Sequence, residues 1–299
     1  MTAPAIMYCV GATKAGTSWL YRYLHDHPEC HLRSVKELHY FDSFDGEMRD
    51  KQISQFLTNR DRFVRWQIEA QKAKQGWKVD NMQRRIDEMD ALIKVIGGPR
   101  VTDQAYLEYL TQGAGDAKIV GDMTPGYSLV DENMLRRMAA VGETTKFIYL
   151  IRDPVERLWS HVRMQAKRFL QPDETVEQKA KRILNRTVNK GMETHIPARG
   201  DYRGTIMRLR ATIPAANLLV EFAEALFSEN GLRRVCDFLG LVYRPADVRE
   251  TVHAGTKVEM NEGQRAATAH FLRHQYEWVA DNVGPLPDAW QSNLAKALT

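Results

Sequence analysis

The sequence predicts an α/β fold in which a central parallel sheet lies between layers of helices. Two observations carry this prediction: short apolar runs alternate with longer helical patterns, and a glycine-rich turn joins the first run to a helix. Parallel strands that helices cover on both faces are typically continuous apolar segments, as these are. We therefore expect one domain over residues 1–299, built in three layers.

Four apolar runs are predicted to be strands. The first, at residues 5–10, is bounded by Gly11, and the others lie at residues 118–121, 146–151 and 217–222. The run K-F-I-Y-L-I at 146–151 is long enough and apolar enough to be a buried strand.

Helices are predicted between and after these strands. Trp19, Leu20, Tyr23 and Leu24 have helical spacing over residues 17–25, and Pro28 follows. Further helical patterns cover the following segments: 131–141, the stretch through Trp159 toward Phe169, 174–190, 202–213, 232–239 and most of the chain after Asn261.

The segment at about 43–118 differs in composition from the rest, because it is rich in Arg, Lys, Gln and Asp. Met82, Ile86, Met89 and Ile93 form one helical stripe there, which we interpret as core packing. Gly97, Gly98 and Pro99 end it. We therefore expect a mainly helical insertion on the α/β core.

Composition excludes several classes of protein. Hydrophobic residues make up 43% of the 299 residues, which excludes a disordered chain. The formal net charge of +4 is too small to indicate a nucleic-acid partner. The 3 cysteines are too few and too scattered for a disulfide framework or a zinc site, so reduced thiols and a cytoplasmic location are expected. No apolar run predicts an integral membrane segment.

The sharpest motif is the loop G-A-T-K-A-G-T-S at residues 11–18. It follows a strand and opens a helix, the setting in which backbone N–H groups and a helix N-terminus hold phosphate groups. The fold is therefore expected to be P-loop-like. However, Thr17 stands where a triphosphate-binding loop has its lysine, and the one lysine, Lys14, lies inside the turn. An ordinary glycine turn with a solvated lysine is the alternative.

A second motif, I-R-D-P-V-E-R-L-W-S, occupies residues 151–160. Arg152 leaves a predicted strand at its carboxyl end, where parallel sheets bind ligands, and Ser160 lies about two helical turns further on. Together they could hold a second anion. Alternatively, Arg152 pairs with a nearby carboxylate such as Asp153 or Glu156.

A third motif, V-K-E-L-H-Y-F-D at residues 35–42, contains Glu37, His39 and Asp42. Alternation along an extended segment would place Glu37 and His39 on one side of it. A carboxylate and an imidazole beside a phosphate loop suit the removal of a proton from a hydroxyl group. A solvated surface segment is the alternative.

Together, and in their order along the chain, these three motifs resemble the sulfotransferase family that uses 3′-phosphoadenosine-5′-phosphosulfate (PAPS). The loop and the L-x-x-x-L-x-x-H-P of residues 20–28 resemble its 5′-phosphosulfate loop, and the motif at 151–160 resembles its 3′-phosphate motif. K-E-L-H-Y-F-D and G-D-M-T-P-G-Y (121–127) are similar to segments of the heparan-sulfate-type and bacterial branch, and the likeness extends to residues 201–202 and 236–241. The insertion matches nothing in it.

The resemblance implies roles for individual residues. Lys14 and Glu37 would be catalytic, with Glu37 as general base and His39 assisting it or competing for that role. The positions implied to bind the donor PAPS are Thr13, Lys14, Ala15, Gly16, Thr17 and Ser18 at the 5′ end, Arg152 and Ser160 at the 3′-phosphate, Tyr202 near adenine, and, more loosely, Gly255, Thr256 and Lys257. No metal is implied. The product would be adenosine 3′,5′-bisphosphate.

One departure concerns the acceptor. The branch has a lysine where this chain has Met123, so one expected cation is missing, which weakens the case for a heparan-like acidic acceptor. A small molecule, a lipid or a glycan with a hydroxyl group remains open, as does the oligomeric state. The alternative activities are a P-loop kinase or NTPase with Mg²⁺ on Asp153 and Ser18, and a binding protein with a degenerate loop.

Overall fold

The computed structural model describes residues 3–246 and 258–298 and contains a parallel sheet in the order β2-β3-β1-β4-β5. The strands are β1 (Ala5–Gly11), β2 (Cys30–Leu32), β3 (Ile119–Asp122), β4 (Thr145–Ile151) and β5 (Leu218–Phe222). The central strand β1 pairs with β3 on one side and β4 on the other, so Ile6 lies opposite both Val120 and Thr145. The carboxyl ends of these three strands therefore meet at one edge.

The four predicted strands are confirmed, with bounds that shift by one residue. Asn217 belongs to the short helix η2 (Ala215–Asn217) and precedes β5. The edge strand β2 was not predicted, because its three residues, C-H-L, give no apolar run for a pattern to detect.

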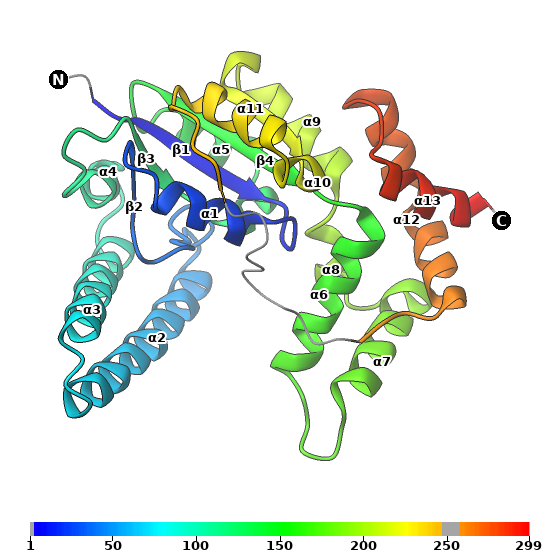
Figure 1. Ribbon diagram of the computed structural model, residues 1–299, viewed down its shortest axis with the longest axis horizontal. Helices are drawn as coiled ribbons and strands as arrows, with labels where there is room; N and C mark the ends of the chain where they lie inside the picture. Colours follow the sequence, from blue (N-terminus) through cyan, green and yellow to red (C-terminus); the bar gives the residue numbers. More distant parts are fainter. Residues whose placement is uncertain (1–2, 247–257, 299) are drawn as a thin grey trace.

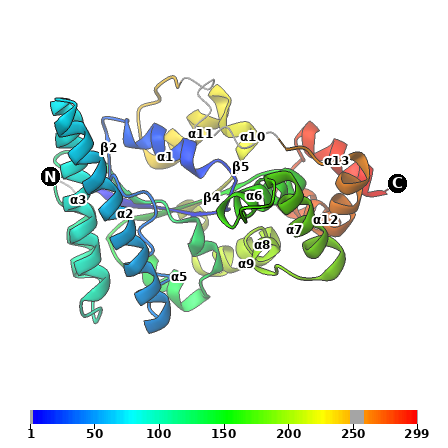
Figure 2. The ribbon, with the colours of Figure 1, turned by 90° about the horizontal axis from the view of Figure 1, so that it is seen from below.

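Helices cover both faces of the sheet, as the fold class predicts (Figure 2). On one face lie α1 (Thr17–His25), α10 (Ala223–Leu226) and α11 (Glu229–Leu239), and on the other lie α5 (Glu132–Ala139) and α9 (Tyr202–Thr212). The short helix η1 (Pro125–Leu129) follows β3.

A second group of helices lies beyond β4, at the carboxyl edge of the sheet (Figure 1). Its members are α6 (Pro154–Arg168), α7 (Val176–Lys190), α8 (His195–Ala198), α12 (Glu262–Asn282) and α13 (Asp288–Leu298). The first of these, α6, begins directly after β4, and Asp153 caps it by accepting a hydrogen bond from the N–H of Glu156 at 2.9 Å.

The segment expected to be a helical insertion contains α2 (Gly46–Lys72), α3 (Gly76–Gly97) and α4 (Gln104–Thr111). The first two pack against each other as a hairpin that projects away from the sheet (Figure 1). Met82, Ile86 and Met89 are buried, as predicted, whereas the buried row continues through Leu92 and Ile96 and leaves Ile93 at its border. That this segment is an addition to a smaller core stays a prediction.

Candidate active site

A tight turn joins β1 to α1. Its backbone is left-handed at Lys14, with φ of 73°, and at Gly16, with φ of 90°. Gly16 caps α1 without a side chain, and the N–H groups of Thr17 and Ser18 have no acceptor among the described residues. Unpaired N–H groups at a helix N-terminus attract anions. The loop therefore has the backbone geometry that the sequence predicts for a phosphate site.

Arg152 leaves the end of β4 beside this loop. Its guanidinium Nη1 lies 3.4 Å from the backbone carbonyl oxygen of Lys14 and donates a hydrogen bond to it. Asp153 caps α6, and Glu156 pairs with Arg265 at 2.5 Å. In the described part of the chain, neither carboxylate forms an ion pair with Arg152, so the alternative in which Arg152 pairs with Asp153 or Glu156 is wrong.

Positive charge accumulates around the loop. Burial lowers the pKa of Lys14, and the charges of Arg152, Lys36 and Arg163 lower it further, while Glu37 acts in the opposite direction. Cations that destabilise one another in this way are stabilised when an anion binds among them. The loop and the end of β4 thus form one cationic site and not two unrelated ones.

Glu37 and His39 do come together, although the segment that carries them is not extended. His39 Nε2 lies 3.6 Å from Glu37 Oε2, and His39 Nδ1 lies 2.8 Å from Asp42 Oδ2. Leu38 between them is buried, so the two side chains lie on one side of the segment, as predicted. The expected extended course is wrong, because the segment forms no strand and its backbone turns at His39, where φ is 52°. The turn places the imidazole between two carboxylates.

The carboxylates of Glu37 and Asp42 determine the protonation state of His39. Burial alone would lower the pKa of His39, but the hydrogen bonds with Asp42 and Glu37 outweigh it and raise that pKa to about 9. Burial alone would raise the pKa of Glu37, but hydrogen bonds from His39 and Lys36 outweigh it and lower that pKa to about 2. At neutral pH the imidazole is therefore protonated and the Glu37 carboxylate is ionised.

Known proteins share this chain's architecture. The model of the family described as "Sulfotransferase family" matches residues 7–245. The chain belongs to the sulfotransferase family. No curated protein sequence matches it.

Solved sulfotransferase structures are similar to this sulfotransferase. The crystal structure of the sulfotransferase from Alicyclobacillus acidocaldarius has 19% identity and a TM-score of 0.62, with 97% of this chain and 100% of that chain covered. The sulfotransferase domain from the curacin biosynthetic pathway has 16% identity and a TM-score of 0.46, with 99% and 98% covered. The domain from the Synechococcus PCC 7002 olefin synthase has 19% identity and a TM-score of 0.46, with 99% and 93% covered. The first of these likenesses shows the shared fold.

A buried carboxylate anchors the segment that carries Glu37 in this sulfotransferase. Asp122, at the end of β3, accepts hydrogen bonds from the hydroxyls of Thr124 and Tyr127, both at 2.6 Å, and from Tyr106 at 2.8 Å. In turn, the Thr124 and Tyr127 hydroxyls accept the backbone N–H groups of residues 38–41. The sequence analysis named the motif at residues 121–127 but gave Asp122 no role. Only the fold shows that Asp122, through these hydroxyls, holds the backbone of residues 38–41.

Tyr202 lies beneath the site. Its side chain is 0% exposed, and its hydroxyl donates to the Arg152 carbonyl oxygen at 2.5 Å and accepts from the Arg152 N–H at 3.2 Å. A ring buried in this way supports the end of β4, and the geometry favours that positioning role over contact with adenine. An exposed aromatic ring lies beside Gly16 of the loop: Phe227 is 40% exposed and packs edge-on against Trp19 at 5.2 Å. The sequence analysis gave Phe227 no role.

The remaining predicted residues fall in three places. Ala15 is buried and its N–H bonds to the Ala12 carbonyl at 3.1 Å, which shapes the turn, while the buried Thr13 hydroxyl has no partner among the described residues. Ser160 lies half-buried on α6. Gly255, Thr256 and Lys257 lie outside the described residues.

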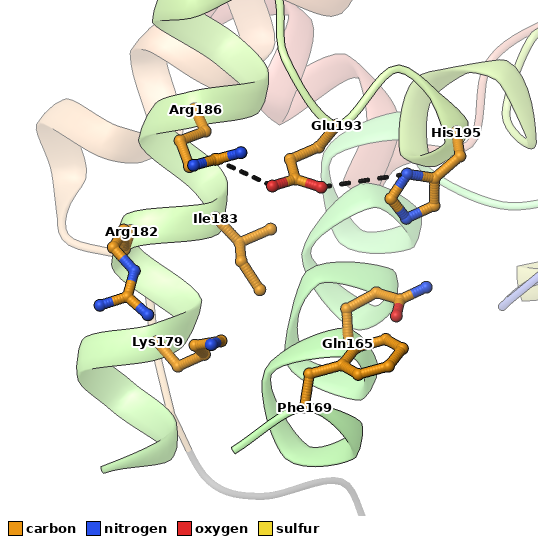
Figure 3. A pocket seen from close by; sticks show the side chains of 8 residues that line it. All are labelled: Gln165, Phe169, Lys179, Arg182, Ile183, Arg186, Glu193 and His195. Atoms are coloured by element: carbon orange, nitrogen blue, oxygen red, sulfur yellow. Dashed lines mark ion pairs between the residues drawn. The ribbon is translucent and has the colours of Figure 1, made fainter. Parts of the chain in front are cut away.

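The cavity of about 320 Å³ between α6 and α7 is a different place (Figure 3). Glu193 points into it and pairs with Arg186 at 2.9 Å, and His195 lies 4.0 Å away on the other side. None of the predicted site residues lines it. In the described ranges, no group of three or more His, Cys, Asp or Glu could hold a metal ion, and no helix is long and apolar enough to cross a membrane.

Proposed function

We propose that this sulfotransferase moves a sulfuryl group from PAPS to a hydroxyl group of an acceptor. The observation that carries the proposal is the contact between the Arg152 guanidinium and the Lys14 carbonyl at 3.4 Å. It brings together two sites that each suit an anion. One adenosine ligand with a phosphosulfate at the 5′ position and a phosphate at the 3′ position would occupy both.

The residues present fit such a donor. The unpaired N–H groups at the start of α1, together with Lys14, would hold the 5′-phosphosulfate. Arg152 and Ser160 would hold the 3′-phosphate, because a guanidinium and a hydroxyl both donate to phosphate oxygens. The exposed Phe227 ring offers a surface on which a base can stack. Roles for Gly255, Thr256 and Lys257 stay a prediction.

The transfer itself requires a base and a group that stabilises negative charge. Glu37 would take the proton of the acceptor hydroxyl as its oxygen bonds to sulfur and the bond from sulfur to the 5′-phosphate oxygen breaks. Lys14 would stabilise the charge that grows on that leaving oxygen. His39 is protonated between Glu37 and Asp42 and cannot accept a second proton, so the geometry favours Glu37 as the base.

A Mg²⁺-dependent kinase or NTPase is the competing activity, and the state of Asp153 argues against it. Its carboxylate caps α6 and also accepts a hydrogen bond from the Tyr276 hydroxyl at 3.0 Å. Burial raises the pKa of Asp153 to about 6. A carboxylate that is 1% exposed and already occupied is a poor ligand for a hydrated cation. Transfer that continues in EDTA would support the sulfotransferase, and transfer that stops would support the kinase.

The direct test is a screen with sulfur-labelled PAPS across small alcohols, phenols, glycans and lipids that carry hydroxyl groups. Label should pass to at least one acceptor class with the native chain, and about 10²-fold or more slowly with Glu37→Gln. Adenosine 3′,5′-bisphosphate should bind both proteins in a calorimetric titration. If the native chain binds neither nucleotide, the proposed activity is wrong, and the binding-protein alternative has no support from this ligand either.

A further inference from the structure

Lys36 physically links the donor loop to the candidate base. Its Nζ donates a hydrogen bond to Glu37 Oε1 at 2.9 Å and another to Thr17 Oγ1 at 3.4 Å. Thr17 is the first residue of α1, and its side chain is buried. One ammonium group therefore touches both halves of the site, although the motif analysis gave it no role.

We infer that Lys36 binds the sulfuryl end of the donor, and that in doing so it leaves Glu37 and makes that carboxylate a stronger base. The inference rests on the proposed function and deepens it. In the donor-free protein, the ammonium stays with Glu37. When the donor's anionic end reaches Thr17, the ammonium moves toward it, because a second anion is then within its reach.

Charge around the loop favours this movement. Lys36 is one of the cations that lower the pKa of Lys14, so it already lies close to where the 5′-phosphosulfate would be held. At the end of β3, the residue that follows the strand is Met123, which is buried and uncharged. Lys36 is thus the second lysine, after Lys14, that the described residues place at the 5′ end of the site.

The same movement would tune the base. Hydrogen bonds from His39 and Lys36 keep the Glu37 carboxylate only weakly basic, with its pKa at about 2, although burial alone would raise that pKa. General-base catalysis is most efficient when the pKa lies nearer the working pH. Loss of the Lys36 bond removes one of these hydrogen bonds and raises the basicity of Glu37. The other charged groups facing it, which are His39, Asp42 and Lys14, with Asp122 beneath, stay in place.

The test compares Lys36→Met with Lys36→Arg. The matched control is Lys118→Met, because Lys118 also pairs with a glutamate, Glu29, at 2.5 Å, but lies directly before β3, at the opposite end of that strand from Asp122. Calorimetry with PAPS and with adenosine 3′,5′-bisphosphate measures the donor contact. Lys36→Met should weaken PAPS binding by about tenfold or more, and bisphosphate binding clearly less, since the bisphosphate has no sulfuryl group. Lys36→Arg should restore most of the PAPS affinity.

A second measurement follows the base. The acid limb of kcat/KM for the donor reports the pKa of the free enzyme's base, so it should move to higher pH in Lys36→Met and not in Lys118→Met. Unchanged PAPS affinity and an unchanged acid limb in Lys36→Met, with an active native protein, would overturn the role of Lys36 alone. A native protein that binds neither nucleotide would overturn this role together with the proposed function.

Discussion

The guanidinium of Arg152 donates a hydrogen bond to the backbone carbonyl of Lys14, with Nη1 and O separated by 3.4 Å. The two residues are far apart in the chain, and the pairing of β1 with β4 brings them together. Tyr202 holds the Arg152 backbone from below through both its N–H and its carbonyl. The position of Arg152 is therefore fixed by the sheet. Its contribution to donor binding can be measured separately from catalysis.

Arg152→Ala should mainly weaken the binding of adenosine 3′,5′-bisphosphate. Loss of a charge-assisted contact to a phosphate is expected to lower the affinity about 10- to 100-fold. Isothermal titration measures it, with Arg136→Ala as control, since Arg136 is an exposed arginine on α5 that pairs with Glu132. Equal affinity in the native protein and Arg152→Ala would refute the assignment of the 3′-phosphate to this guanidinium.

The strand ends and the loop could be predicted from sequence because each depends on local pattern. Lys14 lies in a glycine turn after an apolar run, and Arg152 directly follows another such run. For Glu37 and His39 the pattern correctly placed the two side chains together, but it did not predict the course of the backbone that carries them. Its N–H groups bond to the hydroxyls of Thr124 and Tyr127 in place of a neighbouring strand, and that contact is distant in sequence. Hydroxyl groups of distant residues, and not a neighbouring strand, therefore hold this backbone in place.

Burial was the other quantity that the sequence did not reveal. The position of Tyr202 suits a residue near the ligand, yet its ring is fully buried, and its hydroxyl is used by Arg152. Phe227 follows the short helix α10 and belongs to no motif, so nothing in the pattern indicated that its ring lies beside Gly16. Which aromatic residue faces a site depends on how the helices pack, and the linear pattern does not encode that packing.

Glu37→Gln should lower turnover by about 10²- to 10⁴-fold, the usual contribution of a general base, while the affinity for the bisphosphate product stays the same. His39→Ala should cost less, because the imidazole is already protonated and acts through Glu37. Steady-state rates at saturating donor give the comparison. Near-native turnover in Glu37→Gln together with an inactive His39→Ala would reverse the assignment of the base.

The charge of His39 should appear in the pH dependence of stability. Its pKa is about 9 in the folded protein against 6.5 ordinarily, so its ion pairs stabilise the fold fully below pH 6.5, and this stabilisation is lost as the pH rises through 9. The loss is at most about 3 kcal/mol. Urea unfolding at pH 6 and at pH 9.5 measures it. The control is His39→Asn, since asparagine tolerates the left-handed backbone there, and a native protein that loses no more stability than this variant would contradict the ion pairs.

Asp122→Asn should displace the segment that carries the candidate base Glu37 and leave the donor site unchanged. An amide cannot accept hydrogen bonds at both of its ends, so at least one of the hydroxyls of Thr124, Tyr127 and Tyr106 loses its acceptor in a buried place. Unfolding free energy should fall by about 1–3 kcal/mol. Turnover should fall because residues 38–41 lose their anchor, while product affinity should not. Asp50→Asn, at an exposed carboxylate on α2, is the control, and full activity in Asp122→Asn would show that the segment holds its place unaided.

Gly16→Ala tests the loop's backbone. A methyl group there would meet the nearest atom, Phe227 Cζ, at 3.6 Å, which is ordinary contact, so the substitution is opposed by the backbone φ of 90° rather than by space. A side chain in the left-handed region costs about 1–2 kcal/mol. The protein should therefore either lose that much stability or relax the turn and bind the bisphosphate more weakly. Thermal unfolding and calorimetry on the same sample distinguish these two results.

Gly76→Ala is the matched control, since a methyl group at the start of α3 meets no atom within 4 Å and φ is not positive there. It should leave product binding unchanged and, by improving helix propensity, keep or raise the stability. If Gly16→Ala behaved like Gly76→Ala in both measurements, the left-handed turn would not be needed for the anion site.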